Sequence, residues 1–172
     1  SWKYPNGLQH YNQIYQDRHR KRWEIGDWTD DTDMMLCIAD AVNEDKGVNF
    51  LNIAKHFKVW AEGMPMGIGS HTYKVLTIGD YAEKPFEVSY MAWKMSRYQS
   101  AANGGLMRTS VVGLFPRETT ACAEKICQLT HYDPRCVGSC VIVSELIHAL
   151  VYGIEPPTRY KMKDIAKQYD ME

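Results

Sequence analysis

The sequence predicts an all-α fold, a compact orthogonal bundle of several helices. Apolar residues recur with a spacing near 3.6 in almost every segment, which is the period of an amphipathic helix. No segment shows the strict apolar–polar alternation of a half-buried strand. Residues that cap or start helices stand before these segments, and glycine or proline follows several of them.

Four helices are expected in the first part of the chain. The first covers residues 31–42, and the acids in its first turn complement the positive end of the helix dipole. The second starts after Asn49, a favourable N-cap residue, and ends at Gly63-Met64-Pro65. A shorter helix is expected at 72–78, and Pro85 opens the fourth.

The second part of the chain predicts four more helices. Three of them cover residues 106–114, 117–130 and 135–152. Pro134 fits the first turn of the longest, and Gly153 ends it. Thr158 can cap a last helix, which carries an apolar stripe that includes Ile165.

Length and composition fit one domain over residues 1–172. Hydrophobic residues make up 45% of the chain, and 20 basic residues against 21 acidic ones leave a net charge of −1. A folded domain of this size buries roughly 70% of its unfolded surface, so it needs no disulfides. The near-zero charge favours neither nucleic acid nor a membrane as partner and leaves the oligomeric state open.

The compartment is expected to be the cytoplasm. The longest apolar region, 137–151, is interrupted by polar residues, and the start of the chain is polar rather than a signal peptide. The five cysteines are an odd number, and free thiols in a reducing compartment explain them most simply.

Three oxygen-bearing side chains in a row, Thr29, Asp30 and Asp31, open the first helix. At a helix N-terminus the first residue is not yet helical, so the three side chains can converge. A hydroxyl and two carboxylates suit a hard cation such as Mg²⁺ or Ca²⁺. The alternative is a helix start whose acids only complement the dipole, and on composition alone that alternative is the commoner.

Two glycine segments can bring backbone N–H groups close to a ligand. Gly67-Ile68-Gly69-Ser70-His71-Thr72 leads into a helix start, where free N–H groups favour a phosphate. Asn103-Gly104-Gly105 also precedes an expected helix, and the Asn103 side chain can bond a sugar hydroxyl or a phosphate. Each segment alone is equally well explained as a turn.

A fourth segment, Thr130-His131-Tyr132-Asp133-Pro134-Arg135, precedes the longest helix. A single histidine in a loop is more often structural than functional. The order and spacing of all four segments changes this balance, because their coincidence is far more specific than any one of them.

Together the four segments resemble the ADP-ribosylglycohydrolase family. Trp28-Thr29-Asp30-Asp31-Thr32 matches the family's W-T-D-D-T metal motif, and Gly67 and Gly69 match its G-x-G loop. The N-G-x-x-M-R motif is complete at 103–108, and T-H-x-D-P-R is complete at 130–135. The resemblance spans about residues 23–153, with a polar and basic segment at 1–22 and a terminal helix at 154–172.

The resemblance implies a Mg²⁺-dependent hydrolase that releases ADP-ribose from a protein or small-molecule acceptor at the distal ribose. Thr29, Asp30 and Asp31 would supply metal oxygens, and Asp30 or Asp31 would help to deprotonate the attacking water. The substrate-binding residues it implies are Gly67, Gly69, Ser70, Asn103, Gly104 and His131.

Two family features are missing from the sequence. The glycine-rich N-terminal helix ending in G-D-A-x-G has no counterpart before Trp23, and the later D-x-D-T metal motif has none after Gly153. Three oxygens fall short of the coordination that Mg²⁺ demands. The sequence therefore predicts either the N-terminal part of such an enzyme or a shortened relative that binds ADP-ribose without catalysis.

Other clusters are assigned to structure rather than function. The basic run 18–22 could touch nucleic acid, but a solvated face explains it better. Cys122, Cys127, Cys136, Cys140 and His131 could form a zinc site, but their spacing matches no standard ligand pattern and favours the core. Core positions are also expected for Trp28, Trp60 and Trp93, and Tyr132 or Phe115 is a candidate to stack on adenine.

Overall fold

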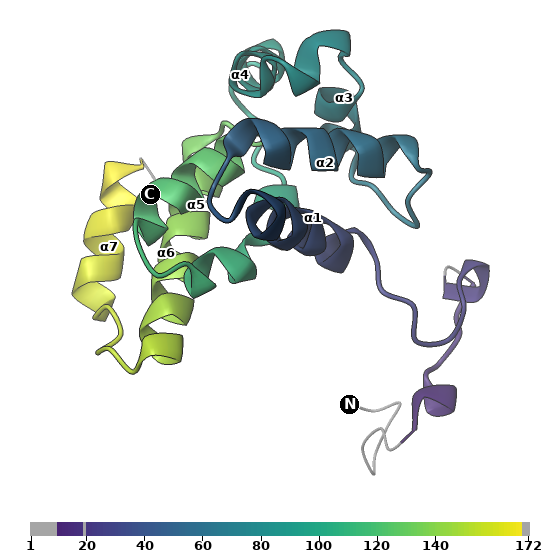
Figure 1. Cartoon of the computed structure of the whole chain (residues 1–172), viewed down its shortest axis with the longest axis horizontal. Helices are drawn as coiled ribbons and strands as arrows, with labels where there is room; N and C mark the ends of the chain where they lie inside the picture. The colour runs from purple at the N-terminus through teal and green to yellow at the C-terminus, as the bar shows by residue number, and fades with distance from the viewer. Residues whose placement is uncertain (1–9, 19, 170–172) are drawn as a thin grey trace.

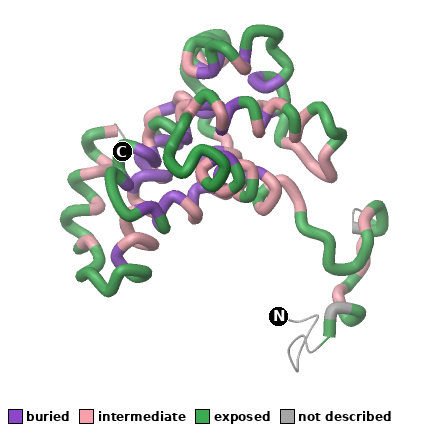
Figure 2. The backbone as a smooth tube through the Cα atoms, viewed as in Figure 1, coloured by how far each residue is buried: buried purple, intermediate pink, exposed green. Residues whose placement is uncertain are grey.

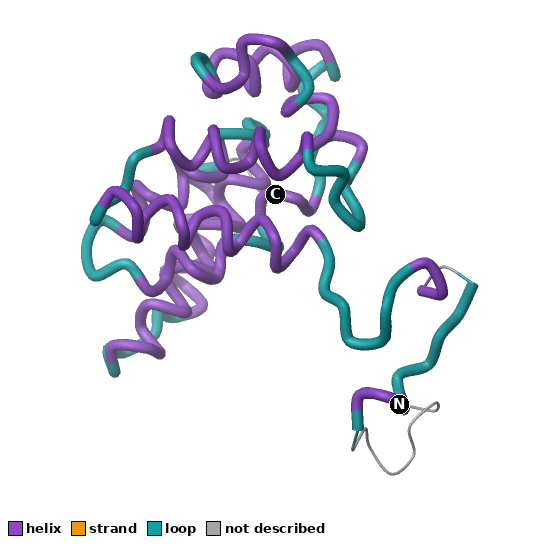
Figure 3. The backbone as a smooth tube through the Cα atoms, turned by 45° about the vertical axis from the view of Figure 1, so that its right-hand side comes forward, coloured by secondary structure: helices purple, strands orange, loops and turns teal. Residues whose placement is uncertain are grey.

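The structure, a computed structural model, describes residues 10–18 and 20–169 and confirms the all-α prediction. Those residues form helices and loops with no strand (Figure 3). The α-helices are α1 (Asp30–Asp45), α2 (Phe50–Glu62), α3 (Ser70–Leu76), α4 (Pro85–Met95), α5 (Thr119–Gln128), α6 (Pro134–Tyr152) and α7 (Arg159–Gln168). Short 3-10 helices are η1 (Tyr11–Gln13), η2 (Arg20–Arg22), η3 (Gly79–Ala82), η4 (Asn103–Gly105) and η5 (Thr109–Leu114). Of the basic run 18–22, His19 lies outside the described residues.

The helix ends follow local capping chemistry. The Asn49 side chain accepts hydrogen bonds from the Leu51 and Asn52 amides at the start of α2. Thr158 caps α7 in the same way, and Pro85 and Pro134 occupy the first turns of α4 and α6. Gly153 closes α6 with a φ of 64°, a left-handed conformation that favours glycine. These boundaries confirm the sequence predictions.

The helices pack as two adjoining groups around one core. α1 lies along α2, while α5, α6 and η5 pack together and α7 covers α6 (Figure 1). α3 and α4 lie on the side of α2 away from α1, and the residues before α1 extend from the helical body (Figures 1 and 2). The largest fully buried apolar side chains include Met34, Ile38, Ile53, Phe57, Leu76 and Ile126.

Residues 106–114 do not form the expected α-helix. η4 and η5 are 3-10 turns instead, joined by Leu106–Arg108. Three β-branched residues and Gly113 give this segment a low helix propensity. The segment is held by tertiary packing, because Gly113 lies directly against Ile147 and Ser144 of α6.

Gly113→Ala is expected to lower the free energy of unfolding by roughly 1–3 kcal/mol, the cost of overpacking a filled core. A Cβ there would lie 2.6 Å from Ile147 carbons and 3.0 Å from the Ser144 carbonyl oxygen, so η5 and α6 would have to separate. Gly47→Ala is the matched control, because its Cβ would meet nothing within 4 Å. Urea unfolding of both variants checks the prediction, and equal stabilities would contradict it.

α6 is the one described helix long and apolar enough, by length and composition alone, to cross a membrane. In this structure it packs along η5 and α5. Its cysteines support the core assignment: Cys136 and Cys140 are buried beside Cys127, and all five cysteines are free thiols. Among the described residues no three His, Cys, Asp or Glu side chains are placed to hold a metal ion, so the structure gives the zinc alternative no support.

Candidate functional site

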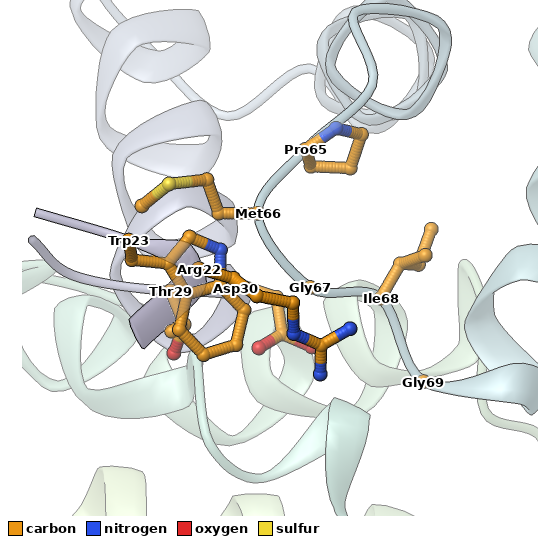
Figure 4. Close-up of a pocket in the computed structure, with 9 residues that line it drawn as sticks. All are labelled: Arg22, Trp23, Thr29, Asp30, Pro65, Met66, Gly67, Ile68 and Gly69. Carbon is orange, nitrogen blue, oxygen red and sulfur yellow. The ribbon is translucent and has the colours of Figure 1, made fainter. Parts of the chain in front are cut away.

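A pocket of about 620 Å³ opens at the N-terminus of α1. Thr29 and Asp30 lie on one side of it, and the connection between α2 and α3 forms the other (Figure 4). The residues that line it are Arg22, Trp23, Thr29, Asp30, Pro65, Met66, Gly67, Ile68 and Gly69. Two of the four motif segments therefore share one pocket, although they are more than 30 residues apart in sequence.

The two segments come into contact at Gly67. A Cβ on Gly67 would lie 3.6 Å from Asp30 Oδ1, so the backbone of the loop runs directly past the carboxylate. Arg22 and Trp23 also border the pocket, and sequence reasoning missed both of them. The Arg22 guanidinium lies over the Trp23 ring, 5.5 Å from its centroid.

The acidic pair at the start of α1 is electrostatically unfavourable as it stands. Burial, reinforced by the neighbouring Asp31 carboxylate, raises the pKa of Asp30 above its ordinary value. Asp31 is exposed, and its Oδ2 accepts a hydrogen bond from Thr29 Oγ1 over 3.1 Å. Mutual repulsion of the two carboxylates thus opposes the stabilisation that each gains from the helix dipole, and a perturbed pKa in a pocket is typical of functional sites.

The third acid of this helix turn, Asp33, has a structural role. Its two carboxylate oxygens accept the indole N–H groups of Trp28, at 2.9 Å, and Trp60, at 3.0 Å. Both tryptophans were expected in the core. That prediction is wrong for Trp28, which is 58% exposed, whereas Trp60 packs against the core. Asp33 lies at the surface of α1, so a tryptophan that donates its indole N–H to this carboxylate stays near the surface. Trp60 is accordingly half-buried. Trp93 is half-buried as well, with its N–H on Asp133.

The remaining motif segments meet behind α3. A Cβ on Gly104 would lie 2.7 Å from Thr72 Oγ1, 2.9 Å from His131 Cε1 and 3.1 Å from His131 Nε2. Gly69, the residue before α3, also faces Thr72 Oγ1, with its Cβ position at 3.8 Å. Thr72, the last residue of the Gly67–Thr72 segment, therefore joins the Gly67–Gly69 loop to η4 and His131.

His131 is fully buried and neutral. Burial, together with the Arg108 cation and the His71 ring, holds the pKa of His131 well below its usual range. Its Nδ1 lies 2.7 Å from Thr130 Oγ1, while Nε2 has no hydrogen-bond partner among the described residues. A buried polar nitrogen left in this state costs about 1–3 kcal/mol, and the ring lines none of the pockets described here.

His71 forms a second arm of the same network. Its Nε2 donates to the Thr130 carbonyl oxygen over 2.9 Å, since that oxygen can only accept. Its Nδ1 therefore accepts from the Ser100 hydroxyl over 2.7 Å, and burial lowers the pKa of the ring. The His71 and His131 rings lie 4.7 Å apart, centroid to centroid.

Asp133 fixes the loop that carries His131. Its Oδ1 accepts the Arg135 amide and side-chain Nε, and its Oδ2 accepts Arg135 Nη2 and the Trp93 indole N–H. The Arg135 guanidinium and these hydrogen bonds hold the pKa of the carboxyl below its ordinary value, despite its burial. Asp133 is thus a structural anchor and cap of α6.

Not all the candidate residues face the first pocket. Ser70 lines a second pocket of about 540 Å³ together with His71, Lys74, Ile78, Ala92, Met95, Ser96 and Ser100. Asn103 is exposed and lines a smaller hollow of about 200 Å³ beside Arg135 and Ser139. Phe115 is buried in the core and Tyr132 packs against Tyr90 and Trp93. Neither aromatic lines either of the two larger pockets.

In this all-α fold, the acidic start of α1 faces the glycine loop Gly67–Gly69 across a pocket, which is a site able to bind a polar, oxygen-rich ligand. The chain belongs to the ADP-ribosylglycohydrolase family, which matches it over residues 2–170. The matched range is wider than the expected resemblance over 23–153.

The chain is also similar to a protein of Pseudomonas putida (strain GB-1) named ADP-ribosylarginine hydrolase Tri1. The two are 22% identical over 139 residues, which make up 78% of this chain and 38% of the relative. The chain therefore spans well under half the length of the curated relative that it matches.

Proposed function

We propose that the chain binds an ADP-ribose group and, with Mg²⁺, hydrolyses the bond that joins its distal ribose to an acceptor. One observation carries the proposal: the four motif segments form a continuous line of contacts. Asp30 touches the position of Gly67, Thr72 faces both Gly69 and Gly104, and Gly104 lies on His131. The sequence resemblance alone did not require these segments to meet.

The two larger pockets suit the two ends of such a ligand. The segment Gly67–Ser70 lies between them, because Gly67 and Gly69 line one and Ser70 lines the other. With the diphosphate on this segment, the distal ribose reaches the acidic pocket. The adenosine then enters the second pocket, where Ile78, Ala92 and Met95 supply apolar surface.

The hydroxyl and carboxylate oxygens at the start of α1 are the type of ligand atom that a hard divalent cation prefers. Thr29, Asp30 and Asp31 would hold Mg²⁺, and the ion would supply positive charge to orient ribose hydroxyls and to make a nearby water more acidic. The raised pKa of Asp30 beside Asp31 supports this assignment, since two adjacent carboxylates are stabilised by a positive charge.

Hydrolysis adds water across the glycosidic bond. The bond from the ribose carbon to the acceptor breaks, and the water oxygen forms a new bond to that carbon. One water proton passes to a carboxylate oxygen of Asp30 or Asp31, and the departing acceptor atom takes up a proton. The same carboxylates stabilise the positive charge that develops on the ribose. The relative's name makes ADP-ribosylated arginine the first acceptor to test.

A second candidate function is ADP-ribose binding without catalysis. It is favoured by the small number of oxygen ligands: two carboxylates and one hydroxyl at α1, joined by no further His, Asp or Glu group in the described part of the chain. Binding and hydrolysis are distinguished by whether free ADP-ribose accumulates from an ADP-ribosylated arginine substrate over time.

A thermal melt with excess ADP-ribose and Mg²⁺ is expected to raise the midpoint. A ligand at a hundredfold excess over its Kd stabilises the folded state by roughly 2.7 kcal/mol. A rise that requires Mg²⁺, with accumulation of ADP-ribose, supports the hydrolase. A rise without accumulation supports the binding protein, and a cooperative melt with no shift contradicts both. ADP and ribose 5-phosphate, tested separately with Mg²⁺, are the ligand controls.

A further inference from the structure

Two hydrogen bonds of the Thr130 hydroxyl, to Arg108 and to His131, determine which nitrogen of His131 carries the proton. Arg108 Nη2 donates to Thr130 Oγ1 over 2.7 Å, because a guanidinium can only donate. The threonine oxygen therefore accepts from Arg108, and its single hydroxyl proton remains for His131 Nδ1, 2.7 Å away. In this arrangement Nδ1 accepts and the ring proton lies on Nε2.

The opposite tautomer leaves more groups unpaired. With the proton on Nδ1, both the Thr130 hydroxyl proton and the Nε2 lone pair would lack a partner among the described residues. With the proton on Nε2, only the Nε2–H group of this pair lacks a hydrogen-bond partner within the described part of the chain. The positive charge of Arg108 also favours the orientation in which the Thr130 O–H and the His131 N–H dipoles point away from the guanidinium.

Arg108 can determine the direction of these hydrogen bonds because its own guanidinium is held in place. It is fully buried, donates to the Ile126 carbonyl over 3.0 Å, and lies over the Phe57 ring at 4.4 Å from the centroid. Its Nη1 donates to the sulfur of Met34, one helical turn after Asp30, and its Nε has no hydrogen-bond partner among the described residues. The guanidinium therefore links the core under α1 to the loop that carries His131.

We infer that Thr130 is a positioning residue that holds His131 as the Nε2–H tautomer. Its hydroxyl accepts from Arg108 and donates to His131 Nδ1, so the ring carries a hydrogen-bond donor directly beneath Gly104. The inference rests on the proposed function for its ligand, an oxygen-rich ADP-ribose group. Nε2 lies against Gly104 and beside Thr72, between the loop at 67–70 and η4. His131 is fully buried and lines none of the pockets described above, so a phosphate or ribose oxygen reaches this donor only where Gly104 and Thr72 move aside.

The tautomer is tested directly by the ¹⁵N NMR spectrum of the histidine rings, with His131→Gln used to assign the signals. The wild-type protein is expected to show a single Nε2–H pattern for His131. Thr130→Ser keeps the hydroxyl and should keep that pattern, whereas Thr130→Val should lose it. A wild-type Nδ1–H pattern overturns the inference without any variant, and an unchanged pattern in Thr130→Val overturns the role of Thr130.

Affinity for ADP-ribose in the presence of Mg²⁺ gives the second readout. Thr130→Val is expected to weaken binding about tenfold, the order expected for one hydrogen bond, and Thr130→Ser to restore it. Thr119→Val is the matched control, because Thr119 is another buried threonine with a histidine Nδ1, that of His148, at 3.2 Å. Equal affinities for wild type and Thr130→Val would overturn the inference.

The two readouts separate this inference from the proposed function. If wild type shows the Nε2–H pattern but does not bind ADP-ribose, the proposed function fails while the positioning of His131 by Thr130 stands. If wild type binds ADP-ribose but His131 carries its proton on Nδ1, the proposed function stands and this inference fails.

Discussion

The double variant Asp30→Ala/Asp31→Ala is expected to lose Mg²⁺-dependent stabilisation by ADP-ribose and to release ADP-ribose roughly 10²–10⁴-fold more slowly, the range for removal of a general base. Two of the three side chains proposed to hold Mg²⁺ at the start of α1 disappear, and with them the carboxylates proposed to accept the water proton. The helices should remain, because each acid in the first turn of α1 stabilises the helix by only about 0.3–1 kcal/mol.

The matched control is Asp40→Ala/Asp45→Ala. It removes the same charge from exposed positions of the same helix, so it reports the effect of net charge and helix stability alone. Circular dichroism checks that both variants keep their helices, and a release assay with and without Mg²⁺ measures the function. Full activity in Asp30→Ala/Asp31→Ala would contradict both the metal assignment and the proposed base.

The helices with strong local signals were predictable from the sequence. Asn49 and Thr158 act through hydrogen bonds to the next few residues, and Pro134 acts through its own ring, so nothing distant decides these boundaries. η5 was not predictable in the same way. Its conformation depends on packing against Ile147 in α6, which lies more than 30 residues further along the chain.

The candidate site shows the same division. The motif residues were visible because their side chains suggest chemistry by themselves. Thr72 and Thr130 stood in quoted segments, but neither was given a role, because a threonine has no local sign of one. Thr72 lies against Gly104, 32 residues along the chain, and the Thr130 hydroxyl accepts from Arg108, 22 residues before it. Arg108 stood within a recognised motif, but its burial beneath α1 follows only from the packing of α1, α2 and α5.

Arg108 is an unusual residue for a protein core, since no carboxylate in the described part of the chain forms an ion pair with it. Burial lowers the pKa of its guanidinium, yet the group is strongly basic enough to stay charged. Its stabilisation comes from neutral partners: the Ile126 carbonyl, the Thr130 hydroxyl and the Phe57 ring. The Ile126 carbonyl belongs to the last turn of α5, where helix carbonyls lack partners within the helix.

Arg108→Ala is therefore expected to lower the free energy of unfolding by about 3–5 kcal/mol. The change leaves a cavity under α1 and α2, and it leaves the Ile126 carbonyl and the Thr130 hydroxyl without their buried donor. Urea unfolding measures the loss. Arg117→Ala removes an exposed arginine and should change stability by less than about 0.5 kcal/mol.

Two further substitutions separate the contributions of volume, charge and hydrogen bonding. Arg108→Met refills the cavity and removes a buried charge, so it should regain part of the stability lost in Arg108→Ala. Arg108→Lys keeps a charge but cannot reach Ile126 and Thr130 with a planar fork, so it should regain less. If Arg108→Ala were as stable as wild type, the guanidinium would not hold α5 to the loop of Thr130 and His131. If lysine were better than methionine, charge rather than geometry would be the stabilising property.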